Sequence, residues 1–119
     1  MSQGVDLPEI RRLVVGISGA SGAILGIRLL EALQLAEQVE SHLVISPAAR
    51  MTITQETDWK YDQVVSLADV VYNHQNIAAS IASGSFDTLG MVIIPCSIKT
   101  LSEVANSYSE NLLSRAADV

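Results

Sequence analysis

The stretch VVGISGASGAILGIRLLEAL, residues 14–33, decides the fold. It begins with β-branched residues, which are typical of a buried strand, and ends in a segment whose apolar residues recur at helical spacing. Between them lies a turn of small residues: Gly16, Ser18, Gly19, Ser21 and Gly22. The stretch therefore predicts a strand over 12–18, a tight turn, and an amphipathic helix from Ala23. The apolar face of this helix is expected to consist of Ile24, Ile27, Leu30, Leu33 and Leu35.

Two further segments repeat this plan. An apolar strand is predicted over 40–46, followed by a helix that starts near Pro47, where a proline without an N–H is tolerated. A third buried strand is predicted over 88–97, with a helix after it. Residues 58–80 fit both a short helix and a short strand. Alternating apolar strands and helices predict an α/β fold, a parallel sheet with helices on both faces.

Length and composition limit the class of protein. A chain of 119 residues that is 49% hydrophobic can bury the core of one domain, which we expect over 12–119 after a flexible leader, 1–11. Its last predicted helix stops at Val119 without a stop signal, so we expect the domain to be incomplete at the C-terminus.

Charge and residue counts exclude several partners. A net charge of -6 disfavours nucleic acids and anionic membranes. No apolar run is long enough for a membrane span, and the N-terminus lacks a signal peptide, so we expect a cytoplasmic protein. One cysteine and two histidines, without ligand spacing, predict no metal site.

The glycine-rich turn is suited to a phosphate. Its backbone can approach a ligand closely, and the N–H groups at the following helix start favour an anion by about 0.3–1 kcal/mol. This favours a nucleotide or flavin mononucleotide (FMN). The turn lacks the Gly-Lys-Ser/Thr ending of a Walker loop and the Gly-x-Ser-x-Gly of a hydrolase elbow, and Ser18 replaces the second glycine of the dinucleotide fingerprint. Tight packing alone is the alternative explanation.

A second set of polar residues follows the other strands. The loop PCSIKT, residues 95–100, offers Ser97, Lys99 and Thr100, and Ser46 follows the strand over 40–46. Because ligands bind at the carboxyl ends of parallel strands, these residues predict a cradle for a phosphate and a ring. Alternatively, the hydroxyls are helix caps and Lys99 is a solvated surface cation.

Three residues have two interpretations each. Cys96 is more typical of a small buried residue than of a catalytic thiol. Glu56 is either a solvent-exposed carboxylate or, in a desolvated pocket, a proton donor and acceptor. Arg115 is either a surface ion-pair partner or a phosphate clamp.

Three stretches, 16–33, 42–57 and 82–119, together resemble the UbiX family of flavin prenyltransferases, long described as aromatic-acid or 3-polyprenyl-4-hydroxybenzoate decarboxylases. The specific feature is the GxSGASG turn combined with PCSxKT and a terminal RAADV. The resemblance implies a flavodoxin-like (Rossmann-like) fold that binds FMN. It also implies metal-independent transfer of a dimethylallyl group from dimethylallyl monophosphate to reduced FMN.

The resemblance also implies a biological setting. The product, prenylated FMN, would serve UbiD-type decarboxylases, in ubiquinone biosynthesis or in aromatic-acid breakdown. The protein would be a cytoplasmic homo-oligomer, commonly a dodecamer. Because family members continue past RAADV, the chain would be their N-terminal portion.

The resemblance assigns roles to individual residues. Ser21 would lie near the reactive flavin nitrogen, Glu56 would transfer protons, and Arg115 would bind the phosphate of the allylic substrate. The implied flavin contacts are Gly19, Ala20, Ser21, Ser46, Ser97, Ile98, Lys99 and Thr100.

Three alternatives to a prenyltransferase are considered. An FMN-dependent cysteine decarboxylase of the same fold is disfavoured, since it requires a histidine after the second strand and an asparagine-methionine motif in the third loop, where this chain has SPAAR and PCSIKT. A non-catalytic FMN-binding or assembly subunit would bind FMN without forming prenylated product. An unrelated α/β domain would bind no flavin.

Overall fold

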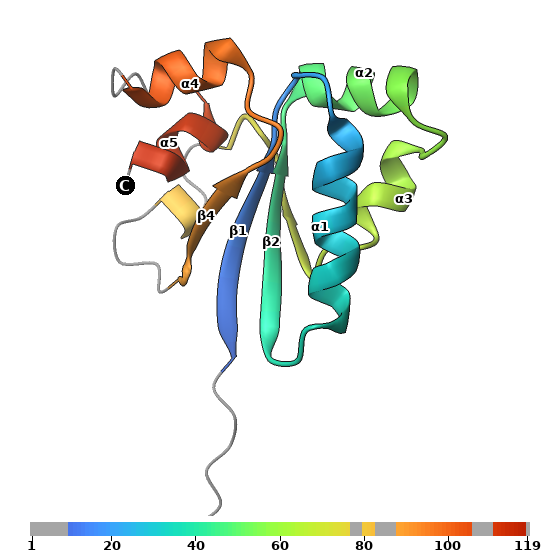
Figure 1. The fold of residues 1–119 in the computed structure, drawn as a ribbon. Helices are drawn as coiled ribbons and strands as arrows, with labels where there is room; N and C mark the ends of the chain where they lie inside the picture. The colour runs from blue at the N-terminus through green and yellow to red at the C-terminus, as the bar shows by residue number, and fades with distance from the viewer. Residues whose placement is uncertain (1–9, 77–79, 83–87, 106–110, 119) are drawn as a thin grey trace, which may run out of the picture.

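The structure, a computed structural model, describes residues 10–76, 80–82, 88–105 and 111–118. Within these ranges the chain forms a four-stranded parallel sheet in the order β3-β2-β1-β4 (Figure 1). Its strands are β1 (Arg11–Ile17), β2 (Val39–Ile45), β3 (Val70–Tyr72) and β4 (Gly90–Ile93). The helical elements are α1 (Ala23–Leu35), α2 (Pro47–Glu56), α3 (Tyr61–Val65), the 3-10 helix η1 (Ser80–Ala82), α4 (Ile98–Ala105) and α5 (Leu112–Asp118).

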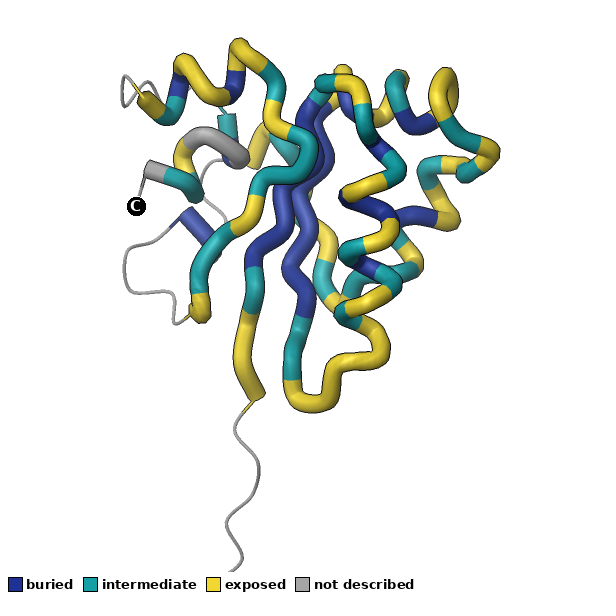
Figure 2. The backbone as a smooth tube through the Cα atoms, in the orientation of Figure 1, coloured by how far each residue is buried: buried dark blue, intermediate teal, exposed yellow. Residues whose placement is uncertain are grey.

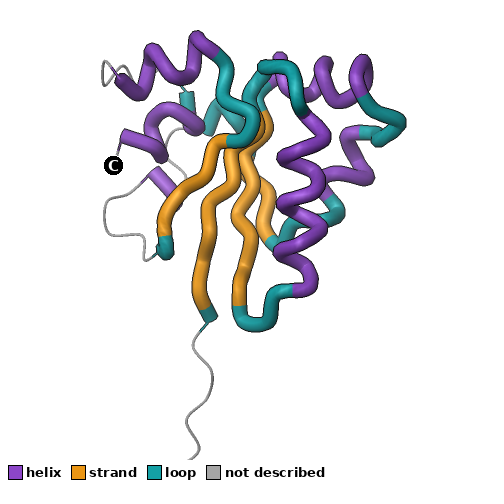
Figure 3. Tube along the Cα trace, in the orientation of Figure 1, coloured by secondary structure: helices purple, strands orange, loops and turns teal. Residues whose placement is uncertain are grey.

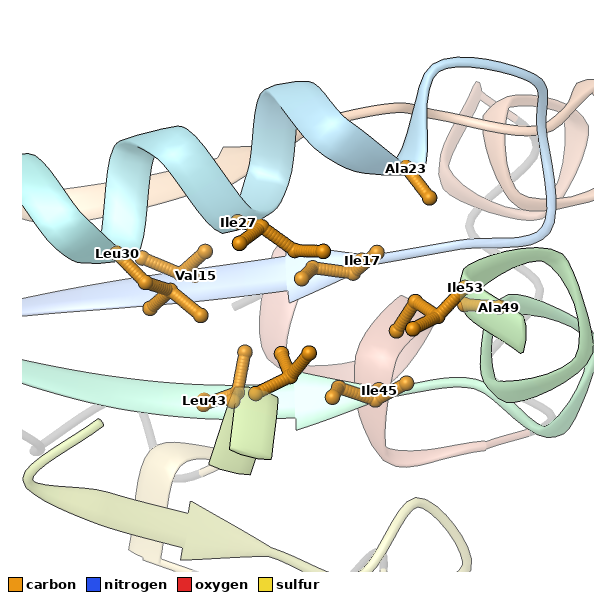
Figure 4. Packing of buried hydrophobic residues seen from close by; sticks show 10 residues of the cluster. Val15, Ile17, Ala23, Ile27, Leu30, Leu43, Ile45, Ala49 and Ile53 are labelled. Atoms are coloured by element: carbon orange, nitrogen blue, oxygen red, sulfur yellow. The ribbon is translucent and has the colours of Figure 1, made fainter. Parts of the chain in front are cut away.

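Helices pack on both faces of the sheet, as the sequence predicts. Successive residues of a strand point to opposite faces, so Val14 and Val15 of β1 enter different cores. On one face α1, α2 and α3 cover a cluster that includes Val15, Ile17, Ile27, Leu30, Leu43 and Ile53 (Figure 4). On the other face η1 and α5 cover a smaller cluster: Val14, Val44, Ile81, Ala82 and Leu112. The predicted α/β class is confirmed.

Residues 58–80, whose sequence fits both a short helix and a short strand, contain both. Helix α3 packs Val64 into the larger core, and β3 pairs with β2 at the sheet edge. Asp69 fixes this arrangement, because its Oδ2 accepts a hydrogen bond from the Ser41 N–H of β2 at 2.8 Å. The strand is too short for a period to be recognised in the sequence.

Three predicted details are wrong. Strand β1 begins at Arg11, so the last residue of the expected leader belongs to the sheet, while residues 1–9 lie outside the described ranges. The third strand is shorter than 88–97, and none of its residues is buried (Figure 2). It pairs only with β1 and forms an edge of the described sheet, so one side stays accessible. Leu35, expected on the apolar face of α1, is 86% exposed because it is the last residue of the helix.

None of the helices among the described residues is long and apolar enough to cross a membrane.

Candidate functional site

The loops that follow β1, β2 and β4 meet at the carboxyl edge of the sheet (Figure 3). The first loop lies in the middle and bonds to both neighbours. On one side Ile17 O accepts a hydrogen bond from the Ser46 N–H at 3.0 Å, and on the other Ser18 N–H donates to Pro95 O at 3.1 Å. The strand order therefore brings together the three loops that the sequence selected.

Ser18 fastens the first loop to the third. Its side chain is buried, with 1% of the residue exposed, and its Oγ donates to Pro95 O at 2.8 Å. The same Oγ accepts from the Ser97 N–H at 2.6 Å. A glycine cannot make these bonds, so the residue that breaks the dinucleotide fingerprint positions the PCSIKT loop instead.

Gly19 allows the first loop to approach the second. A Cβ atom at this position would lie 2.4 Å from Ala48 Cβ and 3.2 Å from the Ala48 carbonyl carbon. Gly22 serves the turn differently, since its φ of 102° lies in the left-handed region that side chains disfavour. The tight-packing explanation is therefore correct at Gly19, whereas Gly22 is favoured by the backbone conformation of the turn; neither role excludes a ligand beside the loop.

A cavity of about 430 Å³ opens where the loops meet. It is lined by residues of all three loops, of α4 and of the segments before η1 and α5: Gly19, Ser46, Pro47, Ala48, His74, Ser97, Lys99, Thr100, Glu103 and Asn111. A pocket at the carboxyl edge of a parallel sheet is the expected place for a ligand.

Two helix N-termini face this cavity. Ser46 caps α2, because its Oγ accepts from the Ala49 N–H at 3.1 Å. Ser97 caps α4 in the same way, accepting from the Thr100 N–H at 3.1 Å and donating to Thr100 Oγ1 at 3.0 Å. The hydroxyls are thus helix caps and also cavity residues. The partial positive charge of two helix starts makes this end of the cavity suitable for a phosphate.

The start of α1 is already occupied by a carboxylate of the chain. Glu56, the last residue of α2, accepts hydrogen bonds at Oε1 from the N–H groups of Gly22 at 3.0 Å and Ala23 at 3.3 Å. These bonds, with a smaller effect of the Ser21 hydroxyl, hold the pKa of Glu56 below its ordinary value of 4.5. The expectation that these N–H groups are free for a phosphate is wrong, and Glu56 is exposed rather than enclosed in a desolvated pocket.

His74 and Lys99 are the basic side chains of the cavity lining. Lys99 is exposed and His74 is half-buried. Burial and the nearby charge of Lys99 lower the pKa of His74, although a hydrogen bond with Asn111 opposes this effect. Near neutral pH the imidazole is therefore uncharged.

A family model described as Flavoprotein matches residues 2–119. The chain belongs to this family. As a flavoprotein it is 60% identical over 110 residues to the flavin prenyltransferase UbiX of Escherichia coli (strain K12), and 58% identical over 108 residues to a probable UbiX-like flavin prenyltransferase of Sedimentibacter hydroxybenzoicus. These matches cover 92% and 91% of this chain but 58% and 57% of the relatives. The flavoprotein chain thus spans little more than half the length of the curated relatives it matches.

Solved structures agree with this flavoprotein in fold. The crystal structure of AnUbiX (PadA1) in complex with FMN and dimethylallyl pyrophosphate superposes with a TM-score of 0.88 at 47% identity, covering 91% of this chain and 57% of that one. A dodecameric FMN-dependent UbiX-like decarboxylase from Escherichia coli O157:H7 superposes with a TM-score of 0.88 at 48% identity. This match covers 90% of this chain and 58% of that one. These matches confirm the flavodoxin-like fold and the resemblance to UbiX proteins. The cysteine decarboxylase TvaF, at 17% identity and a TM-score of 0.68, is similar in fold alone.

The flavoprotein cavity contains half of the predicted residues. Its lining includes five of the predicted flavin contacts: Gly19, Ser46, Ser97, Lys99 and Thr100. It does not include the others: Ala20, Ser21, Ile98, Glu56 and Arg115. Ile98 points outward, with 87% of the residue exposed, and Arg115 is exposed on α5, where neither of its two interpretations is confirmed.

Cys96 differs from its expected placement. It is exposed rather than buried, and partial desolvation raises the pKa of its thiol, which disfavours a nucleophilic thiolate. Across the described ranges, no three His, Cys, Asp or Glu side chains are grouped so that they could hold a metal ion.

Sequence reasoning missed five residues of the cavity lining: Pro47, Ala48, His74, Glu103 and Asn111. His74 and Asn111 lie in irregular segments without a pattern. Glu103 had a signal, because it follows Thr100 by three residues in a predicted helix and therefore lies on the same face.

Proposed function

We propose that this chain is the FMN-binding portion of a UbiX-type flavin prenyltransferase. The reaction transfers a dimethylallyl group from dimethylallyl monophosphate to reduced FMN, and the prenylated FMN then serves UbiD-type decarboxylases. The observation that supports this most strongly is the coincidence of the cavity with five of the flavin contacts implied by the UbiX resemblance. The 60% identity to a named flavin prenyltransferase supports the same reaction.

The residues present fit FMN. Ser46, Ser97 and Thr100, with the helix starts that they cap, would hold the phosphate. Gly19, Ala20 and Ser21 would lie along the flavin, while Lys99 and Ile98 would complete the third loop of the site. When bound in its reduced form, FMN supplies the electron-rich ring that captures the dimethylallyl group.

The other site residues would act on the allylic phosphate and on protons. Arg115 would hold the leaving phosphate through its planar guanidinium. Because its pKa is lowered, Glu56 is anionic at neutral pH and would accept a proton rather than donate one. The Ser21 hydroxyl contributes to that lowered pKa and would orient the carboxylate towards the flavin. No step in this scheme requires a metal ion to activate the allylic phosphate.

Assembly and partners follow from the same proposal. One solved relative is described as dodecameric and FMN-dependent, and we propose a cytoplasmic homo-oligomer for the full polypeptide of this protein as well. The recipient of the product would be a UbiD-type decarboxylase, acting in ubiquinone biosynthesis or aromatic-acid breakdown.

The test uses the full natural polypeptide, after its intact mass has been measured. It is incubated without oxygen with reduced FMN and either dimethylallyl monophosphate or dimethylallyl pyrophosphate, and the flavin is analysed by mass spectrometry. A flavin carrying one added prenyl unit, formed with the monophosphate, is the expected result. Product from the pyrophosphate alone would change the proposed substrate, and flavin binding without product would contradict prenyl transfer.

One observation favours a second candidate, a non-catalytic FMN-binding or assembly subunit. The cavity lining includes five of the implied flavin contacts but neither Glu56 nor Arg115. Tight FMN binding by the full polypeptide with no prenylated product from either allylic substrate is the result that this candidate predicts.

A further inference from the structure

We propose that Glu103 is a specificity-determining residue that binds hydroxyl groups of the polyol chain of the ligand. The inference rests on the proposed function, because it assigns to the same cavity the recognition of a phosphorylated sugar alcohol such as the ribityl phosphate of FMN.

Glu103 is a carboxylate buried in the cavity wall. Only 7% of the residue is exposed, although glutamate is rarely buried without a partner. It lies on α4 three residues after Thr100, so its Cα is about 4.5 Å further along the helix axis. Thr100 stands at the helix start that is suited to the phosphate. Glu103 is therefore placed one turn beyond the phosphate end of the cavity.

The described neighbours of Glu103 leave its acceptor capacity largely unused. An ionised carboxylate has about four acceptor positions. Asn111 Nδ2 lies 3.4 Å from both oxygens, at the long limit for a hydrogen bond. None of the ion pairs formed among the described residues involves Glu103. Of the two basic side chains in the same lining, His74 is uncharged near neutral pH and Lys99 forms no ion pair with Glu103.

A buried carboxylate is stabilised by hydrogen-bond donors at its spare acceptor positions, and a ligand in the cavity can supply them. A phosphate or a ring carbonyl cannot supply them, because both are acceptors and would be repelled. Hydroxyl groups can donate, and in FMN they lie on the chain that joins the phosphate to the ring, closer to the phosphate than the N–H group of the ring. With the phosphate at the start of α4, this chain is the part of the ligand that would run past Glu103.

The experiment separates the hydroxyl groups from the rest of the ligand. The full polypeptide is titrated with oxidised FMN and with a flavin analogue whose phosphate is carried on a five-carbon chain without hydroxyls. Flavin fluorescence reports the dissociation constant. The variants are Glu103→Ala, Glu103→Gln and, as a control, Glu37→Ala, which removes an exposed carboxylate from the turn after α1.

Glu103→Ala is expected to weaken FMN binding about tenfold, the loss of one hydrogen bond to a charged group, and to leave binding of the analogue within about twofold. Glu103→Gln keeps one acceptor oxygen, so its dissociation constant for FMN should lie between those of Glu103→Ala and the unaltered protein. Its dissociation constant for the analogue should not follow this order. Glu37→Ala should change neither constant. Circular dichroism shows whether each variant is folded, and Glu103→Gln provides the comparison if Glu103→Ala is not.

Four outcomes would overturn the inference. Equal losses for FMN and the analogue would show that Glu103 only supports the fold of α4. Tighter FMN binding by Glu103→Ala would show that the carboxylate repels the ligand. If the unaltered protein binds neither flavin, the proposed function fails and the inference fails with it. If every variant binds both ligands equally well, the inference alone is refuted.

Discussion

Glu56 and Gly22 join the end of α2 to the start of α1, because Glu56 Oε1 accepts the Gly22 N–H at 3.0 Å across 34 residues of sequence. Helix α1 has no side-chain cap of its own, and its cap residue is a glycine. The carboxylate takes the place of a local cap and also matches the negative charge that a helix start favours.

Replacing Glu56 with glutamine should lower the melting temperature modestly. The amide oxygen keeps an acceptor at the helix start but loses the charge that strengthens both bonds. Glu56→Ala should lower it further, because the N–H groups of Gly22 and Ala23 then lose their partner. Thermal unfolding followed by circular dichroism measures both, with Glu37→Gln as the control. Unchanged melting temperatures in both Glu56 variants would mean that the contact contributes nothing to stability.

The same contact predicts a dependence of stability on pH. Since the pKa of Glu56 is lower in the folded chain than its ordinary value of 4.5, the unfolded chain binds the proton more readily. The contribution of Glu56 to the free energy of unfolding is therefore complete above pH 4.5. It is lost as the pH falls through the lower pKa that Glu56 has in the folded chain. Denaturant unfolding of the unaltered protein and Glu56→Gln from pH 3 to pH 7 checks the sign: the difference between them should shrink in acid. A difference that stays constant would exclude this linkage.

Local patterns in the sequence were sufficient for the elements and the sheet, but not for contacts between distant segments. Gly22 ends the turn before α1 with a φ of 102°, which glycine adopts readily, so the turn is readable locally. Ser46 and Ser97 follow strands, and parallel pairing brings such positions together. The bond between Glu56 and Gly22 depends on how α2 packs beside α1, which no local pattern encodes. The exposure of Cys96 likewise follows from β4 ending at Ile93, before the cysteine.

Gly19→Ala tests the approach of the first loop to the second. The added Cβ would lie 2.4 Å from Ala48 Cβ, so one loop must shift, at an expected cost of about 1–3 kcal/mol in the free energy of unfolding. FMN binding should weaken as well, because both residues line the cavity. Denaturant unfolding and flavin titration measure the two effects.

The double variant Gly19→Ala with Ala48→Gly is the matched control for that clash. Removing the Ala48 Cβ should recover part of the lost stability. The remaining loss would come from the backbone at position 48, whose carbonyl carbon would lie 3.2 Å from the Cβ added at position 19. Gly90→Ala provides a second comparison, since its φ of 149° is strained for alanine but nothing lies near the added atom. If the double variant is no more stable than Gly19→Ala, the contact with Ala48 is not the cause.

Ser18→Ala should separate the first loop from the third. The variant leaves the partly buried Ser97 N–H without the acceptor that it contacts at 2.6 Å, which is expected to cost about 1–3 kcal/mol in the free energy of unfolding. Since Ser97 caps α4 and lines the cavity, the loss should also weaken FMN binding, even though Ser18 itself does not line the cavity. Ser18→Gly, which restores the dinucleotide pattern, should behave like Ser18→Ala.

The control for this prediction is Ser66→Ala, which removes an exposed hydroxyl that donates a hydrogen bond to the Gln63 carbonyl at the end of α3. It should change stability by no more than about 0.5 kcal/mol and leave FMN binding unchanged. Ser18→Thr offers a rescue, because it keeps the Oγ while adding a methyl group in a buried site. Weaker FMN binding in Ser18→Ala and Ser18→Gly, together with partial recovery in Ser18→Thr, would identify the hydroxyl as the link between the loops. FMN binding that is unaffected in all three variants would show that the third loop keeps its position without Ser18.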